Sequence, residues 1–300
     1  MIILLGATAS GKTKLSVRLA HELNGEIISA DSRQVYKGLD IGTGKDLQEY
    51  IINGCNIQYH LIDIISAQEE FNLFEFQAGF YEAYSRLLQR KVLPVVVGGT
   101  GLYLESIILN YQLPEAPPDQ ELRKELQNKS IKELQAGLLA LKRQLHNKTD
   151  MEDKDRLIRA IEIERVRLRQ PADIFQRPIL NAAVFGIRYE RSVLRKRITA
   201  RLTQRLDQGM IDEVKALQNS GLSWAKLDSF GLEYRYVSQY LQGQITYGEM
   251  FEKLNTSIHQ FAKRQETWFR RMERKGITIN WINGDDYNLL KEGVMKFLND

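Results

Sequence analysis

The sequence predicts an α/β fold, in which a parallel sheet flanked by helices is interrupted by an inserted helical subdomain. Three observations lead to this expectation. Short apolar runs alternate with helically periodic segments through the first hundred residues, which is typical of βαβ units. A glycine-rich turn ending in Lys12-Thr13 joins the first apolar run to the first helical segment. A charged, helical stretch over residues 120–169 then separates two α/β parts.

The elements of the core follow from apolar periodicity. Ile2–Leu5 is a continuous apolar run and predicts a buried strand, and Lys12–Leu23 predicts a helix with leucines on one face. Apolar runs also predict strands over Glu26–Ala30, Tyr59–Ile65, Val92–Val97, Ala182–Ile187 and Thr278–Ile282, with a helix over Phe71–Gln89. The prolines Pro114, Pro117 and Pro118 end the first part. We therefore expect a catalytic core from residues 1–115 and 178–300, and a helical insertion from residues 116–177.

Composition restricts the class of protein. Hydrophobic residues make up 43% and charged residues 27% of the 300 residues, which excludes a disordered chain. The longest apolar runs are far shorter than a membrane span, so we expect no membrane anchor. The single cysteine, Cys55, cannot form an internal disulfide and indicates a reducing compartment, so we expect a cytoplasmic protein. The four histidines show no ligand spacing, and none is assigned to a metal.

Basic residues are clustered although the net charge, 42 minus 38, is only +4. One cluster spans Val184–Arg205 and the other spans His259–Lys275. On the second stretch, apolar residues share one helical face while Lys263, Arg270 and Arg274 lie opposite. Such clusters fit a polyanion such as RNA, and a solvated helix face is the alternative.

Residues 6–13 match the P-loop pattern and stand between a predicted strand and a predicted helix. Glycines there let backbone N–H groups close around phosphate oxygens at a helix N-terminus. Lys12 adds a positive charge, and the Thr13 hydroxyl can meet Mg²⁺ or a phosphate oxygen. We therefore expect a P-loop NTPase-like core that binds a diphosphate or triphosphate through Gly6-Ala7-Thr8-Ala9-Ser10-Gly11-Lys12-Thr13.

Three polar residues follow predicted strands and should lie at the same edge of the sheet as the P-loop. Asp31 can accept a proton or hold a metal, or it can cap the next helix. Asp63 can be interpreted as a metal-binding carboxylate of the ATPase type. Thr100 follows Gly98-Gly99, which either permits close approach of a ligand or forms a plain turn.

Further segments, in chain order, carry more specific motifs. They are Glu26–Tyr36 (EIISADSRQVY), Asp40–Thr43 (DIGT), Gly98–Tyr103 (GGTGLY), Asp155–Glu162 (DRLIRAIE), Arg197–Arg201 (RITAR) and Lys263–Arg270 (KRQETWFR). Together with the P-loop they resemble the tRNA dimethylallyltransferase family, also called tRNA isopentenyltransferases. The resemblance covers nearly the whole chain. It implies transfer of a dimethylallyl group from dimethylallyl diphosphate to N6 of the adenosine 3′ of the tRNA anticodon, position 37.

The resemblance also implies roles for individual residues. Asp31 would accept the N6 proton, Thr100 would meet the reacting end, Arg201 would help hold the diphosphate, and Mg²⁺ would lie near Thr13. The tRNA anticodon stem-loop would contact residues from the core and from the insertion, namely Asp31, Ser32, Arg33, Gln34, Arg156, Arg159, Tyr234, Arg235, Lys263, Arg264, Gln265, Thr267, Trp268 and Arg270. We expect the enzyme to be a monomer.

The chain departs from the family in two places. The family commonly has Gly-Tyr-Arg where this chain has Glu233-Tyr234-Arg235, and the segment between Leu138 and Asp155 is short. Some assignments also stay open on the residues alone. Gln265 lies at the centre of an apolar helical face, where a structural hydrogen bond is the alternative to a substrate contact. Trp268 can stack on a base or pack in the core.

Two other functions compete with prenyl transfer. A nucleotide-dependent kinase or ATPase would need little more than the P-loop, Asp31 and Asp63. An RNA-binding protein with a vestigial P-loop is the other alternative, which the intact Lys12-Thr13 disfavours.

Overall fold

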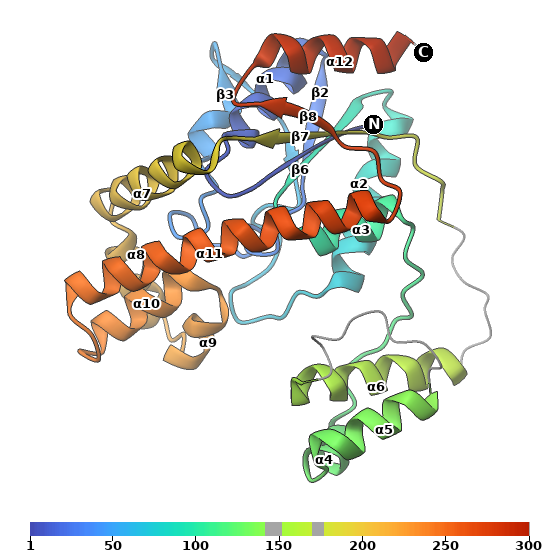
Figure 1. The fold of residues 1–300 in the computed structure, drawn as a ribbon, viewed down its shortest axis with the longest axis vertical. Helices are drawn as coiled ribbons and strands as arrows, with labels where there is room; N and C mark the ends of the chain where they lie inside the picture. Colours follow the sequence, from blue (N-terminus) through green and yellow to red (C-terminus); the bar gives the residue numbers. More distant parts are fainter. Residues whose placement is uncertain (142–151, 170–176, 300) are drawn as a thin grey trace. The chain divides into compact units, whose positions relative to one another are not determined.

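The described residues, 1–141, 152–169 and 177–299 of a computed structural model, contain a six-stranded parallel sheet (Figure 1). Its strand order is β5-β2-β6-β1-β7-β8, so the first strand of the chain is central. Ile3 of β1 lies opposite Val96 of β6 and Val184 of β7. The predicted parallel α/β fold is therefore confirmed. The strands are β1 (Ile2–Gly6), β2 (Gly25–Ser29), β5 (Tyr59–His60), β6 (Leu93–Gly98), β7 (Ala183–Arg188) and β8 (Asn280–Asn283).

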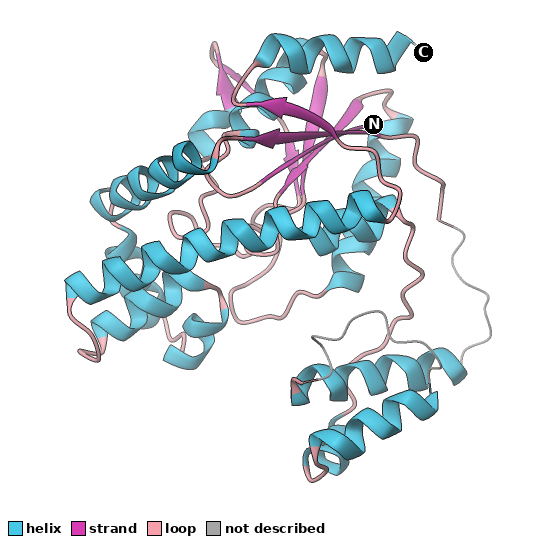
Figure 2. Cartoon of the chain, in the orientation of Figure 1, coloured by secondary structure: helices cyan, strands magenta, loops and turns pink. Residues whose placement is uncertain are grey.

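Helices cover both faces of the sheet (Figure 2). Side chains alternate along β1, so Ile2 and Leu4 join one core while Ile3 and Leu5 join the other. The first core is closed by α1 (Lys12–Glu22) and α12 (Tyr287–Asn299). The second is closed by α2 (Leu73–Gln89), α3 (Gly101–Ile108) and the C-terminal part of α11 (Tyr247–Arg274).

A third apolar core is helical and lies beside the sheet. It contains buried residues of the N-terminal part of α11, among them Met250, Leu254 and Ile258. The same helix reaches the sheet through Phe269 and Met272, so α11 belongs to two cores. The other helices of this third core are α7 (Arg191–Asp207), α8 (Met210–Asn219), α9 (Trp224–Ser229) and α10 (Leu232–Leu241).

The chain divides into two compact units, of which the second spans Tyr111–Pro178. The predicted insertion, residues 116–177, differs from this unit by a few residues at its start and one at its end. Three described helices form its apolar core: α4 (Gln120–Gln127), α5 (Ile131–Leu141) and α6 (Lys154–Arg169). Buried Glu162 accepts hydrogen bonds from Arg123 and Arg159. Most of the short segment between residues 138 and 155 lies outside the described residues.

The structure differs from the sequence expectations in two places, one strand that is shorter and one hairpin that was not predicted. The strand predicted over Tyr59–Ile65 ends at His60, because Leu61 and Asp63 adopt positive φ angles of 63° and 55° and turn the chain away. A small antiparallel hairpin, β3 (Ile51–Ile52) with β4 (Cys55–Asn56), was not predicted. Its turn is Asn53-Gly54, with φ angles of 49° and 78°. Asn-Gly is a strong signal for such a hairpin turn.

Gly98, at the end of β6, allows two strand ends to lie unusually close together. A methyl group at this position would overlap the Ala30 carbonyl oxygen. We expect Gly98→Ala to destabilise the protein by about 1–3 kcal/mol, because the backbone must shift to accept the added carbon. Denaturant unfolding measures the change.

The matched control is Gly248→Ala, on α11, where an added methyl group meets no atom within 4 Å. We expect it to be neutral or to stabilise by about 0.5–1 kcal/mol, since alanine favours a helix over glycine. Equal effects of the two substitutions would contradict the close approach inferred at Gly98.

Candidate active site

A cavity of about 230 Å³, here called the central cavity, opens at the carboxyl ends of β1, β2 and β6. This is the edge at which α/β sheets bind ligands. Side chains from α7, α10 and α11 complete its wall. The structure thus brings together most of the core residues that the sequence singled out: Thr8, Lys12, Thr13, Asp31, Ser32, Arg33, Gln34, Thr100, Arg201, Tyr234 and Gln265.

The P-loop has the backbone conformation of an anion site. Ala9 and Gly11 have positive φ angles of 61° and 81°, which turn the chain so that α1 begins at Lys12. The Lys12 ammonium group lies 3.4 Å from the Ala7 carbonyl oxygen. From α7, Arg197 Nε donates a 2.9 Å hydrogen bond to the Ala9 carbonyl oxygen. Lys12 from α1 and Arg197 from α7 therefore both hold the backbone of the P-loop, just before the N-terminus of α1.

Gln265 fastens the P-loop to the next strand end. Its Oε1 accepts a 2.8 Å hydrogen bond from Thr8 N, and its Nε2 donates a 2.9 Å bond to the Gly99 carbonyl oxygen. The side chain is 7% exposed, so both amide atoms are used on backbone. The structural hydrogen bond that the sequence left open for Gln265 is therefore present, and contact of Gln265 with tRNA stays a prediction.

Asp31 and Thr100 come from adjacent strand ends and are joined through the backbone between them. Asp31 Oδ1 accepts a 2.9 Å hydrogen bond from Arg33 N, which makes a local turn instead of a helix cap. Thr100 Oγ1 accepts a 3.2 Å bond from Ser32 N. A carboxylate and a hydroxyl therefore line the same cavity as the P-loop.

Cations crowd the phosphate side of the cavity. Burial, and then the charge of Arg201, lower the pKa of Lys12 to about 8, although Asp31 acts in the opposite direction. Burial, and then Arg205, lower the pKa of Arg201 to about 10. Each group is disfavoured in its charged form by the others and by the loss of water. A bound anion would relieve this repulsion.

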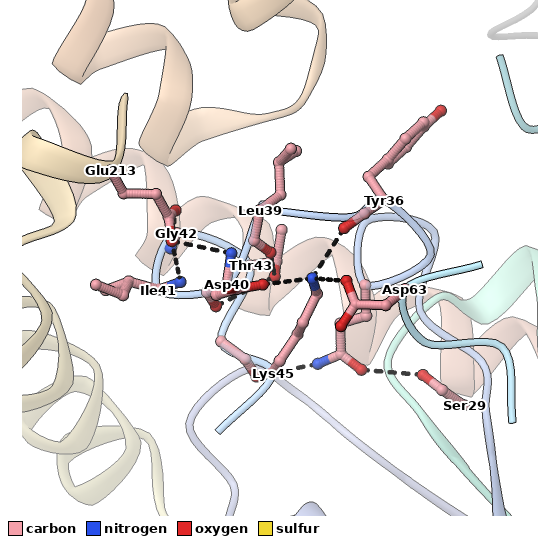
Figure 3. A network of polar contacts seen from close by, with 12 residues as sticks. Ser29, Tyr36, Leu39, Asp40, Ile41, Gly42, Thr43, Lys45, Asp63 and Glu213 are labelled. Atoms are coloured by element: carbon pink, nitrogen blue, oxygen red, sulfur yellow. Dashed lines mark hydrogen bonds and ion pairs between the residues drawn. The ribbon is translucent and has the colours of Figure 1, made fainter. Parts of the chain in front are cut away.

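The loop from Leu39 to Lys45, which forms one wall of the cavity, is fixed by a buried lysine (Figure 3). Lys45 is 1% exposed and donates to the Tyr36 carbonyl oxygen at 2.8 Å and to Asp40 Oδ1 at 2.6 Å. Its third partner is the carboxylate of Asp63. Asp63 thus serves as a counterion inside this network, which favours a structural role over that of an ATPase-type metal ligand.

Glu213 holds the other side of the same loop (Figure 3). Its carboxylate accepts hydrogen bonds of 2.6–3.0 Å from the backbone N–H groups of Asp40, Ile41 and Gly42. The Tyr234 hydroxyl, on a side chain that is 1% exposed, donates to the same carboxylate at 2.7 Å. The loop is therefore clamped on both sides within the protein.

Two residues predicted to contact tRNA are buried parts of this framework. Gln34 accepts from Ser29 Oγ and donates to the Gly44 carbonyl oxygen, each at 3.0 Å. Tyr234 packs against Gly42 and binds Glu213. Gln34 and Tyr234 therefore help to shape the cavity, whose wall includes both residues, and contact of either with tRNA stays a prediction.

The other predicted tRNA contacts lie at the surface. Lys263, Arg264, Thr267 and Arg270 are exposed along α11, and Arg235 is exposed on α10. Trp268 is half-buried, packs against Gly101 and has the Arg271 guanidinium 4.8 Å from its ring centroid. Contact of these residues with tRNA stays a prediction.

In the second unit, Arg156 and Arg159 differ in their surroundings. Arg156 is exposed and lies 3.7 Å from Asp153. Arg159 is half-buried, pairs with Glu162 at 3.0 Å and donates to the Ala116 carbonyl oxygen at 2.7 Å. Arg159 therefore supports the fold of its unit, and contact of either arginine with tRNA stays a prediction.

None of the described helices is long and apolar enough to cross a membrane. Nor does the described part of the chain gather three or more His, Cys, Asp or Glu residues as a metal site would.

A model of the IPP transferase family matches residues 34–272, which is more than half of the chain. The chain belongs to the IPP transferase family. Among curated relatives, tRNA dimethylallyltransferase 1 of Syntrophus aciditrophicus is 53% identical over 97% of this chain and 96% of its own length. The tRNA dimethylallyltransferase 2 of Bacteroides fragilis is 49% identical over 99% of this chain and 98% of its own length. The predicted family is confirmed.

Solved structures support the same conclusion. The tRNA isopentenylpyrophosphate transferase of Bacillus halodurans is 31% identical, with a TM-score of 0.71 over 99% of this chain and 96% of that one. A eukaryotic dimethylallyltransferase is 23% identical with a TM-score of 0.75, and shows the shared fold. These solved structures thus share the overall fold of this chain.

Sequence reasoning missed several residues of this IPP transferase site. Arg197 and Arg205 lie four residues before and after Arg201, the one arginine of α7 with a predicted role, so all three guanidinium groups lie on one face toward the P-loop. This spacing of four residues was a usable signal for Arg197 and Arg205. Glu213 gave no signal, because its backbone partners lie far earlier in the chain. Lys45 gave none because only the folded loop brings the Tyr36 carbonyl oxygen and two carboxylates to its ammonium group.

The pKa of Lys12 gives anion binding a pH dependence. A lysine with a pKa of about 8 is half deprotonated at pH 8. When a ligand that requires the positive charge binds, Lys12 therefore takes up about half a proton. We expect the affinity for an unreactive alkyl diphosphate, whose phosphate ionises near pH 6, to fall as the pH rises above 8. Calorimetry in buffers of different ionisation enthalpy measures the proton uptake.

The control is Lys12→Arg, which keeps a positive charge at these pH values and should bind without proton uptake. An affinity of the unaltered protein that stays constant between pH 7 and 9.5 would contradict the lowered pKa.

Proposed function

We propose that this protein transfers the dimethylallyl group of dimethylallyl diphosphate to N6 of the adenosine at position 37, 3′ of the anticodon, in tRNA. The products are N6-dimethylallyladenosine and diphosphate. The observation that carries the proposal is the juxtaposition in one cavity of a P-loop, several cations, the Asp31 carboxylate and the Thr100 hydroxyl. Relatives with about half of their residues identical are named tRNA dimethylallyltransferases, which agrees with it.

The donor binds through its diphosphate. The backbone N–H groups of the P-loop, the Lys12 ammonium and the Arg201 guanidinium surround the position where this anion lies. As the bond between the prenyl carbon and the diphosphate oxygen breaks, negative charge grows on the leaving group, and these cations stabilise it. Burial, and then the charge of a neighbouring arginine, lower the pKa values of Lys12 and Arg201, so a bound anion would favour the charged form of each group.

Mg²⁺ is the cofactor that this donor set fits. The Thr13 hydroxyl lines a second cavity with the carboxylates of Asp46 and Glu49. Oxygen ligands of this kind are those that Mg²⁺ prefers, together with phosphate oxygens and water. When bound near Thr13, the ion would neutralise part of the charge of the diphosphate.

The acceptor adenine lies beside Asp31 and Thr100. An exocyclic amine is a poor nucleophile until its proton has an acceptor, and Asp31 provides one. The N6 atom forms the new bond to the prenyl carbon, the proton passes to the Asp31 carboxylate, and the bonding electrons leave with diphosphate. Because the base is normally stacked, it must be flipped out of the anticodon loop to reach the cavity. Ser32 and Arg33 line its path.

Exposed cations hold the RNA outside the cavity. Lys263, Arg264 and Arg270 neutralise phosphates along α11, and Arg235 adds a charge on α10. We place Arg156 and Arg159 of the second unit in contact with the anticodon stem-loop as well. We further propose a cytoplasmic monomer, since residues of one chain suffice to line the cavity and Cys55 is exposed and free.

The direct test is incubation with isotope-labelled dimethylallyl diphosphate, Mg²⁺ and unmodified tRNA, followed by mapping of the label to one nucleoside. Label at the adenosine 3′ of the anticodon supports the proposal. Absence of label from every nucleoside, together with tRNA-independent ATP hydrolysis that Lys12→Ala abolishes, would favour the kinase or ATPase alternative.

Asp31→Asn removes the proton acceptor while keeping the shape and the hydrogen bond to Arg33 N. We expect turnover to fall by about 10²–10⁴, with tRNA affinity little changed. Single-turnover kinetics at saturating tRNA measure the chemical step, and filter binding measures the affinity. Asp285→Asn, on the exposed loop before α12, is the control and should leave both quantities unchanged. Normal turnover at saturation with weakened tRNA binding would assign Asp31 to positioning alone.

The affinity for tRNA should fall steeply as the salt concentration rises. Each phosphate contact contributes about 0.7–0.9 to the slope of log K against log salt concentration. We expect Arg264→Ala combined with Arg270→Ala to reduce the magnitude of this slope by about 1.4–1.8. Lys215→Ala combined with Lys296→Ala, on α8 and α12, removes the same charge from other exposed sites and should leave the slope unchanged. An equal reduction in both double variants would mean that α11 makes no specific contact with phosphates.

A further inference from the structure

Arg205 is a buried cation beside the donor site for which the sequence suggested no role. It lies two helical turns after Arg197 on α7 and is 6% exposed. Its neighbour one turn earlier, Arg201, faces the same cavity. The side chain of Arg205 therefore enters the phosphate side of the site and not the solvent.

The partners of Arg205 in the described part of the chain are only loosely paired. The carboxylate of Asp46 lies 3.7 Å from Nη2 and that of Glu233 lies 4.0 Å from Nη1, both beyond hydrogen-bond distance. Nε and Nη2 are buried and have no hydrogen-bond partner among the described residues. A buried guanidinium normally donates all five of its N–H groups to acceptors. The unpartnered N–H groups of Arg205 are therefore available to a further hydrogen-bond acceptor.

The surroundings identify the kind of acceptor. Arg205 lines the central cavity and also the second cavity, of about 170 Å³, that lies against the P-loop. Lys12, Thr13 and Arg201 line both cavities too. The donors of Arg205 thus share their space with the groups that hold phosphate oxygens, whereas the exposed cations assigned to the tRNA backbone lie on α10 and α11.

The loop opposite Arg205 is shaped to admit this guanidinium. A methyl group on Gly44 would overlap Nη2 of Arg205 and lie 2.8 Å from Nη2 of Arg201. Gly44 also has a φ angle of 64°, which favours glycine. Since Lys45 and Glu213 fix this loop, Arg205 occupies a preformed slot between the loop and α7.

Glu233 explains how a further cation is tolerated beside Lys12 and Arg201. Its carboxylate faces Arg205 from α10 at the position where the family commonly has glycine, and burial raises its pKa while Arg205 lowers it. With Asp46 it supplies negative charge near the guanidinium without binding it tightly. The two carboxylates hold Arg205 in place and leave its N–H groups available.

We propose that Arg205 is a further donor-binding residue, which donates hydrogen bonds to the diphosphate of the prenyl donor and stabilises the charge that develops on it as the carbon–oxygen bond breaks. This inference rests on the proposed function. It adds a second arginine, one helical turn from Arg201, to the groups that hold the leaving group. A guanidinium suits the role because its planar array of N–H groups can bind two phosphate oxygens at once.

The test measures diphosphate binding and catalysis separately. Calorimetry with inorganic diphosphate and Mg²⁺ gives a dissociation constant, and steady-state kinetics give kcat and the KM for dimethylallyl diphosphate and for tRNA. For Arg205→Met we expect diphosphate to bind about 10–100-fold more weakly, as after loss of a hydrogen bond to a charged group. The donor KM should rise and kcat should fall, while the tRNA KM stays unchanged. Arg205→Lys keeps the charge without the planar array and should restore part of each loss.

Gly44→Ala tests the slot without altering Arg205 itself. The added methyl group would overlap the Arg205 guanidinium and lie 2.8 Å from Nη2 of Arg201, so it should displace Arg205 more than Arg201 and weaken diphosphate binding at least as much as Arg205→Met does. Gly243→Ala is the matched control, because Gly243 has a similar φ angle of 70° and an added methyl group meets no atom within 4 Å. It should cost stability through the backbone alone and leave diphosphate binding unchanged.

Three outcomes would overturn the assignment. In an active protein, Arg205→Met and Arg205→Lys could lower only the melting temperature, which would make Arg205 a structural residue. A rise in the tRNA KM with unchanged donor parameters would make it a contact of the RNA backbone. Equal effects of Gly44→Ala and Gly243→Ala on diphosphate binding would show that the space beside Gly44 does not position Arg205 for the ligand. Failure of the proposed function is distinct, since the unaltered protein would then bind diphosphate but transfer no label to tRNA.

Discussion

The side-chain amide of Gln265 is the contact on which the geometry of the site depends. It binds the backbone of the P-loop at Thr8 and the backbone after β6 at Gly99, so it sets the spacing between the phosphate side and the side that carries Thr100. It can do so because α11 packs into two apolar cores, one through Ile258 and the other through Phe269. The glutamine lies between those two anchored parts, where it cannot move without disturbing either core.

Charge is distributed unevenly around this framework. Several cations from the P-loop and from α7 line the cavity, and the Asp31 carboxylate, which partly offsets the lowering of the Lys12 pKa, lines it too. The folded chain tolerates the repulsion among Lys12, Arg201 and Arg205 because α7 and the surrounding cores hold them in place. Folding free energy thus maintains an arrangement that is electrostatically unfavourable without a ligand, which is typical of sites for highly charged substrates.

The sequence predicted those features that local patterns encode. Apolar runs of the right length gave the strands of the parallel sheet, and the P-loop gave the anion site, because strand, turn and helix are contiguous in the chain. The positions of Asp31 and Thr100 directly after predicted strands placed both at the edge of the P-loop, and the resemblance added their specific roles. The roles of Gln34, Lys45, Glu213 and Gln265 could not be derived, because each depends on which backbone groups folding brings to a side chain. Asp63 illustrates the difference: its place after an apolar run suggested a metal ligand, and only the three-dimensional position of Lys45 shows it to be a counterion.

The clamping of the Leu39–Lys45 loop by Lys45 and Glu213 has an energetic consequence for ligand binding. A loop that closed only around its ligand would lose conformational freedom at that moment, and the loss would subtract from the affinity. Here three consecutive backbone N–H groups and a buried ammonium order the loop within the fold itself. The entropy of that segment is therefore lost once, when the chain folds, and each catalytic cycle proceeds against a wall that is already in place.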